Sequence, residues 1–158
     1  MTRRLTNMNT GNANEAVLRV NELRTHFRTL DGIVRAVDGV SFEVGCLYEP
    51  LGCAAWAALH AGVTPGDWVA VNGVGFAGNI MLQGAVRSGA AKVIAIDADP
   101  GKLEVARQLG ADYALNLNDT DVRAEVEEIT NGEGVDVSIE AVGGSGEGLK
   151  QCLDMVCH

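Results

Sequence analysis

The chain has 158 residues, which is enough for one domain of ordinary size and too few for two large ones. Hydrophobic residues make up 47% of it, which indicates a packed core and excludes a disordered chain. A net charge of −9 argues against nucleic acid and anionic membranes as partners, because both are polyanions. No apolar run is long enough for a membrane span, and residues 1–14 lack the apolar stretch of a signal peptide. We therefore expect a cytoplasmic protein with reduced cysteines.

The N-terminal part of the chain predicts a short β-rich segment. Residues 1–15 are polar, and we expect them to be disordered. Between residues 16 and 45, four apolar runs favour strands, at 17–20, 25–28, 33–37 and 40–44. Asp31 and Gly32 stand between the second and third runs, and this pair is a hairpin signal.

Residues 46–158 predict a different architecture. Glu49-Pro50 and the Ala-rich sequence after it predict a helix that ends at His60, with Pro50 in its first turn and Trp56 packed on a sheet. Strands are then expected at 68–71, 92–96, 113–115 and 135–139, and helices at 77–88, 100–109, 120–130 and 146–156. Strands that alternate with helices over short connections pair in parallel. The fold class is therefore α/β, with a doubly wound parallel sheet of about four strands after the β-rich segment.

A glycine motif, GVGFAG at 73–78, follows one predicted strand and opens one predicted helix. Gly73 permits a tight turn, Gly75 lets the backbone approach a pyrophosphate, and Gly78 lets the helix pack closely on the strand. Free N–H groups at the helix N-terminus would bind the phosphates. The motif predicts a dinucleotide site that also includes Phe76 and Ala77, in a truncated Rossmann-type sheet.

An acid stands where such a site needs one. Asp97 ends the second predicted strand, 19 residues after Gly78, and would accept hydrogen bonds from both hydroxyls of the adenosine ribose. An ordinary surface Asp after a tight turn is the alternative. Asp97 and Asp99 would repel a 2′-phosphate, which favours NAD over NADP. Lys102, one helical turn further on, is within reach of the ribose or is a solvated lysine.

Six stretches between residues 48 and 155 carry a family likeness: EPLGCA at 49–54, HAGVTPGD at 60–67, VAVNGVGFAGNIMLQGA at 69–85, AKVIAID at 91–97, KLEVARQLGA at 102–111 and VDVSIEAVGG at 135–144. On these residues the chain resembles the zinc-type medium-chain alcohol/polyol dehydrogenases. The resemblance implies NAD as cofactor and hydride transfer from an alcohol bound to a catalytic zinc. It also implies that Glu49 is a zinc-site carboxylate, that Lys102 contacts the ribose, and that residues 141–143, with Val142, pass beside the cofactor.

The resemblance covers only part of that family's length. Its other zinc ligands come from a longer N-terminal catalytic domain, whereas 45 residues precede the match here, and the last strands of the dinucleotide fold would follow His158. We therefore expect an incomplete zinc site with Glu49 as its one matched ligand, no catalytic residue, and an inactive isolated chain. A small alcohol substrate belongs to the full-length family. A partner chain that supplies the missing domain and a homo-oligomer are both left open.

Residues 16–45 carry a second likeness. VLRVNELRTHFR at 17–28 and DGIVRAVDGVSFEV at 31–44 resemble the opening of an oligopeptide/dipeptide ABC-transporter ATP-binding subunit. This likeness implies that Phe27 stacks on adenine, and a join of two gene fragments would explain it. The chain has no G-x-x-x-x-G-K-[ST] phosphate loop, which counts against ATP hydrolysis. An ABC-subunit fragment and a non-catalytic dinucleotide-binding protein are the alternatives to a dehydrogenase.

The other candidate sites have simpler explanations. Cys53 and His60 lie two turns apart on one predicted helix, where a small buried thiol and a helix-end histidine are favoured over metal ligation. Ser138 lies on a predicted buried strand without a histidine partner, so no nucleophile is assigned. Three residues near the C-terminus have a spacing that does not converge on a metal: Cys152, Cys157 and His158.

Overall fold

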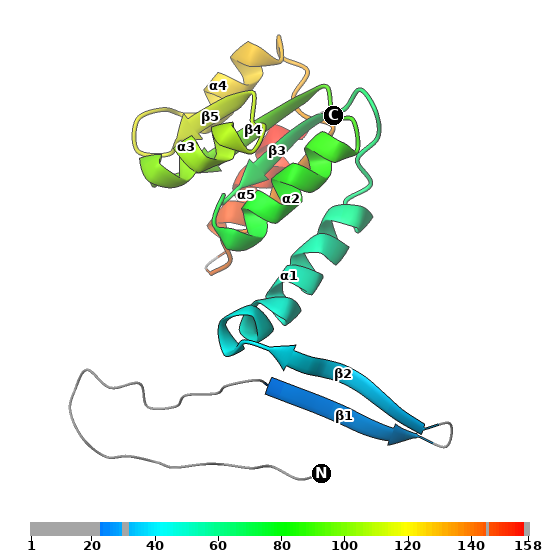
Figure 1. Ribbon diagram of the computed structural model, residues 1–158. Helices are drawn as coiled ribbons and strands as arrows, with labels where there is room; N and C mark the ends of the chain where they lie inside the picture. Colours follow the sequence, from blue (N-terminus) through cyan, green and yellow to red (C-terminus); the bar gives the residue numbers. More distant parts are fainter. Residues whose placement is uncertain (1–22, 30–31, 145, 157–158) are drawn as a thin grey trace, which may run out of the picture. The chain divides into compact units, whose positions relative to one another are not determined.

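The computed structural model describes residues 23–29, 32–144 and 146–156. The chain divides into two units, Met1–Tyr48 and Glu49–His158, and the boundary lies inside helix α1 (Phe42–His60). In the first unit, β1 (Leu23–Thr29) pairs antiparallel with β2 (Gly32–Val40) (Figure 1). This pairing confirms the predicted hairpin. The predicted strand at 17–20 lies outside the described residues.

The predicted strand at 40–44 is wrong beyond Val40, because α1 begins at Phe42. Ser41 explains the start of the helix: its Oγ accepts a hydrogen bond from the N–H of Val44 at 3.3 Å, as an N-cap side chain does. Pro50 consequently lies inside α1 and not in its first turn. A proline nitrogen carries no hydrogen, so α1 lacks one backbone hydrogen bond at this position.

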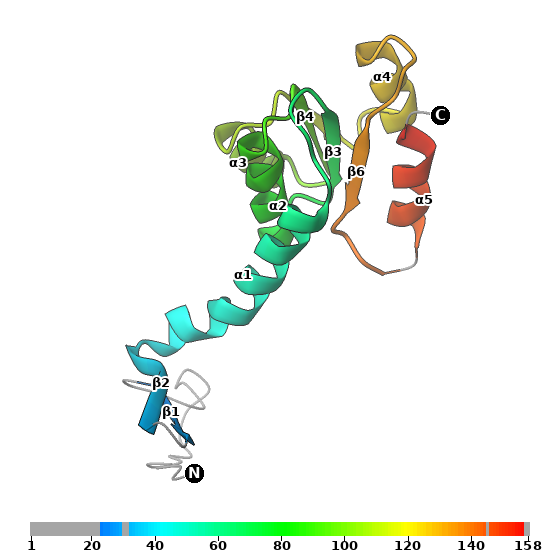
Figure 2. The ribbon, with the colours of Figure 1, turned by 90° about the vertical axis from the view of Figure 1, so that its right-hand side faces the viewer.

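The second unit is built on a parallel sheet of four strands in the order β5–β4–β3–β6. Figure 1 labels β5, β4 and β3, and Figure 2 shows β6 beside β3. The strands are β3 (Trp68–Asn72), β4 (Lys92–Asp97), β5 (Tyr113–Asn116) and β6 (Val137–Glu140). The chain starts with β3 in the middle, adds β4 and β5 on one side, and then adds β6 on the other side of β3. The strand order reverses between β3 and β6, and open α/β sheets bind ligands at the carboxyl ends of the strands at such a switch point.

Two helices cover each face of this sheet (Figure 2). Along β3, Val69 and Val71 face one side and Ala70 faces the other, because successive side chains of a strand alternate. Burying a large aliphatic side chain in such a core contributes about 1.5–3 kcal/mol. α2 (Phe76–Arg87) and α3 (Pro100–Gln108) lie over Val69 and Val71, and α4 (Val122–Ile129) and α5 (Glu147–Met155) lie over Ala70. The predicted Rossmann-type α/β fold is confirmed.

One strand starts later than predicted. Val135, predicted to open a strand, instead makes a single parallel bridge with Val156, and its N–H donates to the carbonyl of Met155 at 2.9 Å. β6 therefore begins at Val137. Within the described residues, no helix is both long and apolar enough to cross a membrane.

The part of α1 that belongs to the second unit packs on α2 through small residues. Ala54 and Ala58 are buried, and a Cβ on Gly84 of α2 would lie 2.6 Å from the Cβ of Ala58. Trp56 lies two residues from each alanine, is 63% exposed, and stacks on the ring of His60 at a centroid distance of 4.0 Å. The prediction that Trp56 packs on the sheet is wrong, because alanines four residues apart occupy the packed face of the helix.

Candidate functional site

The glycine loop, residues 73–78, carries the chain from β3 directly into α2. Gly73 has a φ of +89°, and a Cβ there would lie 2.7 Å from Cγ2 of Val142. A Cβ on Gly78 would overlap the carbonyl oxygen of Gly73. The backbone of the loop therefore approaches both α2 and the segment after β6 more closely than any side chain would permit.

Gly75 differs from the other two glycines of the loop. A Cβ at this position would meet no described atom within 4 Å, so its glycine leaves space toward solvent. Gly75 is also the N-cap residue of α2, and no described side chain caps that helix. The first N–H groups of α2 and the positive end of its dipole thus face an open surface, which suits a phosphate. Phe76 is half exposed beside it.

Asp97 connects the end of β4 to the glycine loop. Its side chain is about 10% exposed. Oδ2 accepts a hydrogen bond from the N–H of Val74 at 3.1 Å, and Oδ1 accepts one from the N–H of Asp99 at 2.9 Å. The Nζ of Lys102 lies 3.5 Å from Oδ1. A carboxylate has about four acceptor positions, so Asp97 keeps capacity for further donors.

A second carboxylate stands next to this position. Asp99 is the N-cap of α3, and its Oδ1 accepts a hydrogen bond from the N–H of Gly101 at 2.8 Å. The carboxyl end of β4 thus presents two acids and one lysine, Lys102, whose side chain is about half exposed.

The segment after β6 lies beside the glycine loop, at Gly73. The N–H of Ala141 donates to the carbonyl of Asn72 at 2.8 Å, which ties this segment to the end of β3. Val142 contacts the open side of Gly73 and is 58% exposed. Sequence reasoning missed Glu140, whose Oε1 accepts from the N–H groups of Val142 at 2.8 Å and Gly143 at 2.7 Å. An acid at a strand end before a Gly-Gly pair is the signal that could have identified it.

The residues predicted for a zinc site lie on α1. The Sγ of Cys53 donates to Oε1 of Glu49 at 3.1 Å, and this hydrogen bond raises the pKa of the Cys53 thiol. Cys53 is exposed and not buried as predicted. The Nδ1 of His60 lies 2.8 Å from the carbonyl oxygen of Trp56. In the part of the chain that the structure describes, no three His, Cys, Asp or Glu side chains gather as metal ligands, so these residues alone do not fit a zinc site.

The residues near the C-terminus divide between the core and the undescribed end. Cys152 is buried under the sheet, whereas Cys157 and His158 lie outside the described residues. Ser138 lies on β6, half-buried as that whole strand is.

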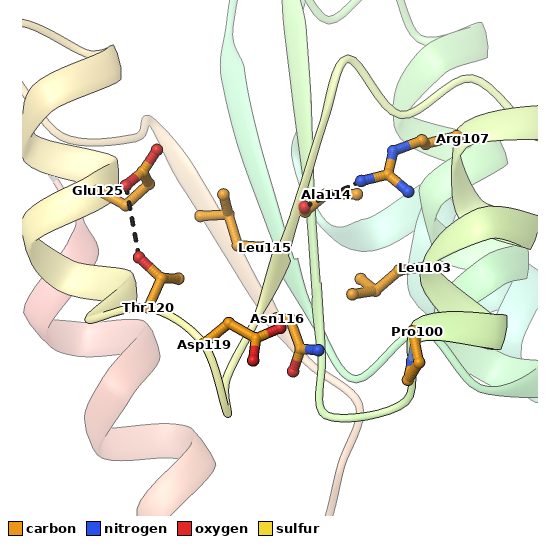
Figure 3. Close-up of a pocket in the computed structure, with 9 residues that line it drawn as sticks. All are labelled: Pro100, Leu103, Arg107, Ala114, Leu115, Asn116, Asp119, Thr120 and Glu125. Carbon is orange, nitrogen blue, oxygen red and sulfur yellow. Dashed lines mark hydrogen bonds between the residues drawn. The ribbon is translucent and has the colours of Figure 1, made fainter.

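A cavity of about 360 Å³ lies away from the glycine loop, between α3, β5 and the start of α4 (Figure 3). Arg107 at its wall donates to the carbonyl of Ala114 at 3.4 Å, and Thr120 donates to Glu125 at 3.4 Å. The glycine loop does not line this cavity, and the carboxylates of Asp119 and Glu125 would repel a phosphate. The cavity is therefore separate from the candidate nucleotide site. Its lining consists of Pro100, Leu103, Arg107, Ala114, Leu115, Asn116, Asp119, Thr120 and Glu125.

Similarity to known proteins decides the family. A family model described as "Zinc-binding dehydrogenase" matches residues 77–158. The chain belongs to the zinc-binding dehydrogenase family. It carries the nucleotide-binding portion of such an enzyme, because the matched residues include the helix after the glycine loop and all of β4, β5 and β6.

Individual curated relatives of the chain are also dehydrogenases. Sorbitol dehydrogenase of Bacillus subtilis (strain 168) is 35% identical over 106 residues, which are 67% of this chain and 30% of that protein. L-Threonine 3-dehydrogenase of Anaeromyxobacter sp. (strain K) is 31% identical over 128 residues, 81% of this chain and 36% of that protein. That alignment is longer than residues 46–158, so it includes part of the chain before residue 46. The chain spans about a third of the length of these curated relatives.

Solved structures give the same result. Alcohol dehydrogenase TADH from Thermus sp. ATN1 matches with a TM-score of 0.65 and 33% identity over 80% of this chain and 36% of that one. The 2R,3R-butanediol dehydrogenase from Bacillus subtilis matches with a TM-score of 0.65 and 31% identity, again over 80% of this chain and 36% of that one. The likeness of residues 16–45 to an ABC-transporter subunit is not supported by these similarities.

Proposed function

We propose that the chain binds NAD at its glycine loop and serves as the nucleotide-binding half of a zinc-dependent alcohol or polyol dehydrogenase. The observation that carries the proposal is Asp97, a buried carboxylate at the end of β4 that accepts a hydrogen bond from the glycine loop. A carboxylate in this position, next to the open N-terminus of α2, would accept hydrogen bonds from the ribose hydroxyls.

In this proposal, different residues bind different parts of the nucleotide. Gly75 leaves room for the pyrophosphate, and the N–H groups of α2 donate to it. Asp97 accepts from the ribose hydroxyls with its remaining lone pairs, and Lys102, which is weakly held at 3.5 Å, can turn to the ribose. Phe76 and Val142 supply exposed apolar surface on either side, and Ala77 is the second residue of α2, under the phosphates.

The same residues select the cofactor. The carboxylates of Asp97 and Asp99 would repel the 2′-phosphate of NADP, and Lys102 alone does not offset both of them. When bound, NAD supplies a nicotinamide ring that accepts a hydride from the carbon of an alcohol. Sorbitol dehydrogenase and erythritol/L-threitol dehydrogenase are among the relatives, which favours a polyol as the substrate.

Asp97→Ser tests the proposal. We expect calorimetric titration of the wild-type chain to show binding of NAD in preference to NADP. Asp97→Ser should weaken NAD binding about tenfold, because hydrogen bonds from the ribose to a charged acceptor contribute about 1.5–3 kcal/mol. It should also bring the affinities for NAD and NADP closer together. Asp119→Ser is the matched control, since it removes an acid outside the glycine loop. If the ratio of the affinities for NAD and NADP is the same in Asp97→Ser as in the wild type, the assignment of Asp97 to the ribose site is refuted.

A second candidate is a dinucleotide-binding protein without chemistry of its own. It is favoured by the lack of a three-ligand metal cluster among the described residues. NADH formation with sorbitol in the presence of added Zn²⁺, lost in Glu49→Ala, would exclude this candidate. Binding of NAD without any turnover would support it.

A further inference from the structure

Three segments meet at the switch point between β3 and β6. Gly73 lies between them: its N–H donates to the carbonyl of Ile96 on β4 at 2.8 Å, and its open side contacts Ala141 and Val142 after β6. The two sides of the glycine loop are thus held by different strands. Asp97 holds the β4 side through the N–H of Val74.

Glu140 has the corresponding place on the β6 side. It is the last residue of β6, and a single oxygen, Oε1, accepts from the N–H groups of Val142 and Gly143. Two short hydrogen bonds to a carboxylate are stronger than bonds to a neutral acceptor. They fix the direction in which the chain leaves β6, and with it the contact of Val142 with Gly73.

The surroundings leave this carboxylate little freedom. A Cβ on Gly148, in the first turn of α5, would lie 3.0 Å from the same oxygen of Glu140. Asn72, at the end of β3, holds that turn, because its Nδ2 donates to the carbonyl of Gly148 at 3.3 Å and to Oε1 of Gln151 at 2.9 Å. Glu140 is half-buried and lies between the segment that it holds and a helix turn that is itself anchored.

We propose that Glu140 is a positioning residue of the nucleotide site. It holds Val142 against Gly73, so that Val142 forms the wall that faces Asp97 across the glycine loop and limits the slot for the adenosine ribose. Val142 is exposed, as a wall that contacts a ligand must be. This inference rests on the proposed function, and it adds a residue that acts through the backbone and does not touch the nucleotide.

The experiment combines four variants with two measurements. ADP is the probe, because it contains the adenosine ribose and both phosphates but no nicotinamide. Glu140→Ala should weaken ADP about five- to tenfold, because Val142 is no longer held, whereas Glu140→Gln keeps an acceptor oxygen and should stay within about twofold of the wild type. Val142→Ala should weaken ADP about threefold. The double variant Glu140→Ala/Val142→Ala should bind ADP no more weakly than Glu140→Ala alone, because the effects of residues that act as one unit are not additive.

Hydrogen exchange of the Val142 and Gly143 amides, measured without nucleotide, is the second measurement. Exchange should be about tenfold faster in Glu140→Ala and unchanged in Glu140→Gln. Glu140→Asp, whose carboxylate is one methylene shorter, takes the place of Glu140→Ala if the latter does not fold.

Unchanged ADP binding in Glu140→Ala would overturn the inference. So would a loss of ADP affinity in the double variant that equals the product of the losses in the two single variants. A wild-type chain that binds neither ADP nor NAD would refute the proposed function and the wall role together. The amide exchange would then still decide separately whether Glu140 holds the segment after β6.

Discussion

The inner and outer strands of the sheet bury different shares of their residues. Every position of β3 and β4 after the first is buried, whereas β5 has one buried residue, Leu115, and each residue of β6 is half-buried. An inner strand pairs on both edges and is covered on both faces, so its side chains have no exposed direction. The glycine loop and Asp97 extend from these inner strands, and Val142 extends from an outer one. The outer side therefore depends on an additional hydrogen-bonding residue, Glu140, to fix its geometry.

The largest effect is expected where the loop meets α2. Gly78→Ala places a Cβ on the carbonyl oxygen of Gly73, and a backbone atom cannot turn aside as a side chain can. We expect this variant to lose about 4–5 kcal/mol of its free energy of unfolding, measured by urea denaturation.

Gly75→Ala is the matched control for this prediction. The position has a φ of −73° and open space around it, so the cost should be below about 1 kcal/mol. The same variant should weaken NAD, because its methyl group occupies the side left open for the pyrophosphate. Equal stability losses in the two variants would contradict the difference between the packed and the open glycine.

A truncation in each kind of strand tests the comparison directly. Ile94 of β4 is fully buried between β3 and β5, and Ile139 of β6 is half-buried. Ile94→Ala should cost about 3–4 kcal/mol, and Ile139→Ala about half as much, because the outer site removes less surface from water and can collapse more easily. Urea denaturation with a constant slope would measure both values. A larger loss for Ile139→Ala would show that the outer strand carries the core.

The success of the sequence-based predictions follows the same division. The strands predicted at 68–71 and 92–96 differ from β3 and β4 by one residue each, because buried apolar runs bounded by turn residues leave little choice. At the outer strand, the prediction 135–139 missed the start of β6, because Val135 pairs with Val156, a partner 21 residues later that no local pattern indicates.

The residues of the candidate site also divide into those that the sequence predicted and one that it did not. Gly73, Gly75, Gly78 and Asp97 follow a spacing that the sequence displays, and the structure brings them together at one sheet edge. Glu140 was missed because its contribution depends on the conformation of the backbone that it holds. The start of α1 was missed because an apolar alternating run at 40–44 outweighed the N-cap residue Ser41.

The smallest expected effect concerns a thiol beneath the outer strand. Cys152 of α5 is 4% exposed and lies in the core on the α4–α5 face of the sheet. Burial raises the pKa of this thiol; Ser138 and Asn72 lower it in part, and the charge of Glu140 raises it further. The folded chain therefore holds the thiol proton more tightly than the unfolded chain does. Stability from this source is complete below the unfolded thiol pKa of about 8.5, and it is lost as the pH rises through the folded pKa.

Melting temperatures from pH 7 to 10.5 test this prediction. The wild type should lose stability more steeply above about pH 8.5 than Cys152→Ala and Cys152→Ser, which cannot ionise at this position. Both variants start from a lower melting temperature, since Ala leaves a small cavity and Ser buries a hydroxyl, so the slope and not the midpoint carries the result. Lysine and tyrosine titrations near pH 10 are common to all three chains and cancel in the comparison. Parallel slopes would show that the space beneath β6 admits water and that the outer side of the sheet is looser than its buried residues indicate.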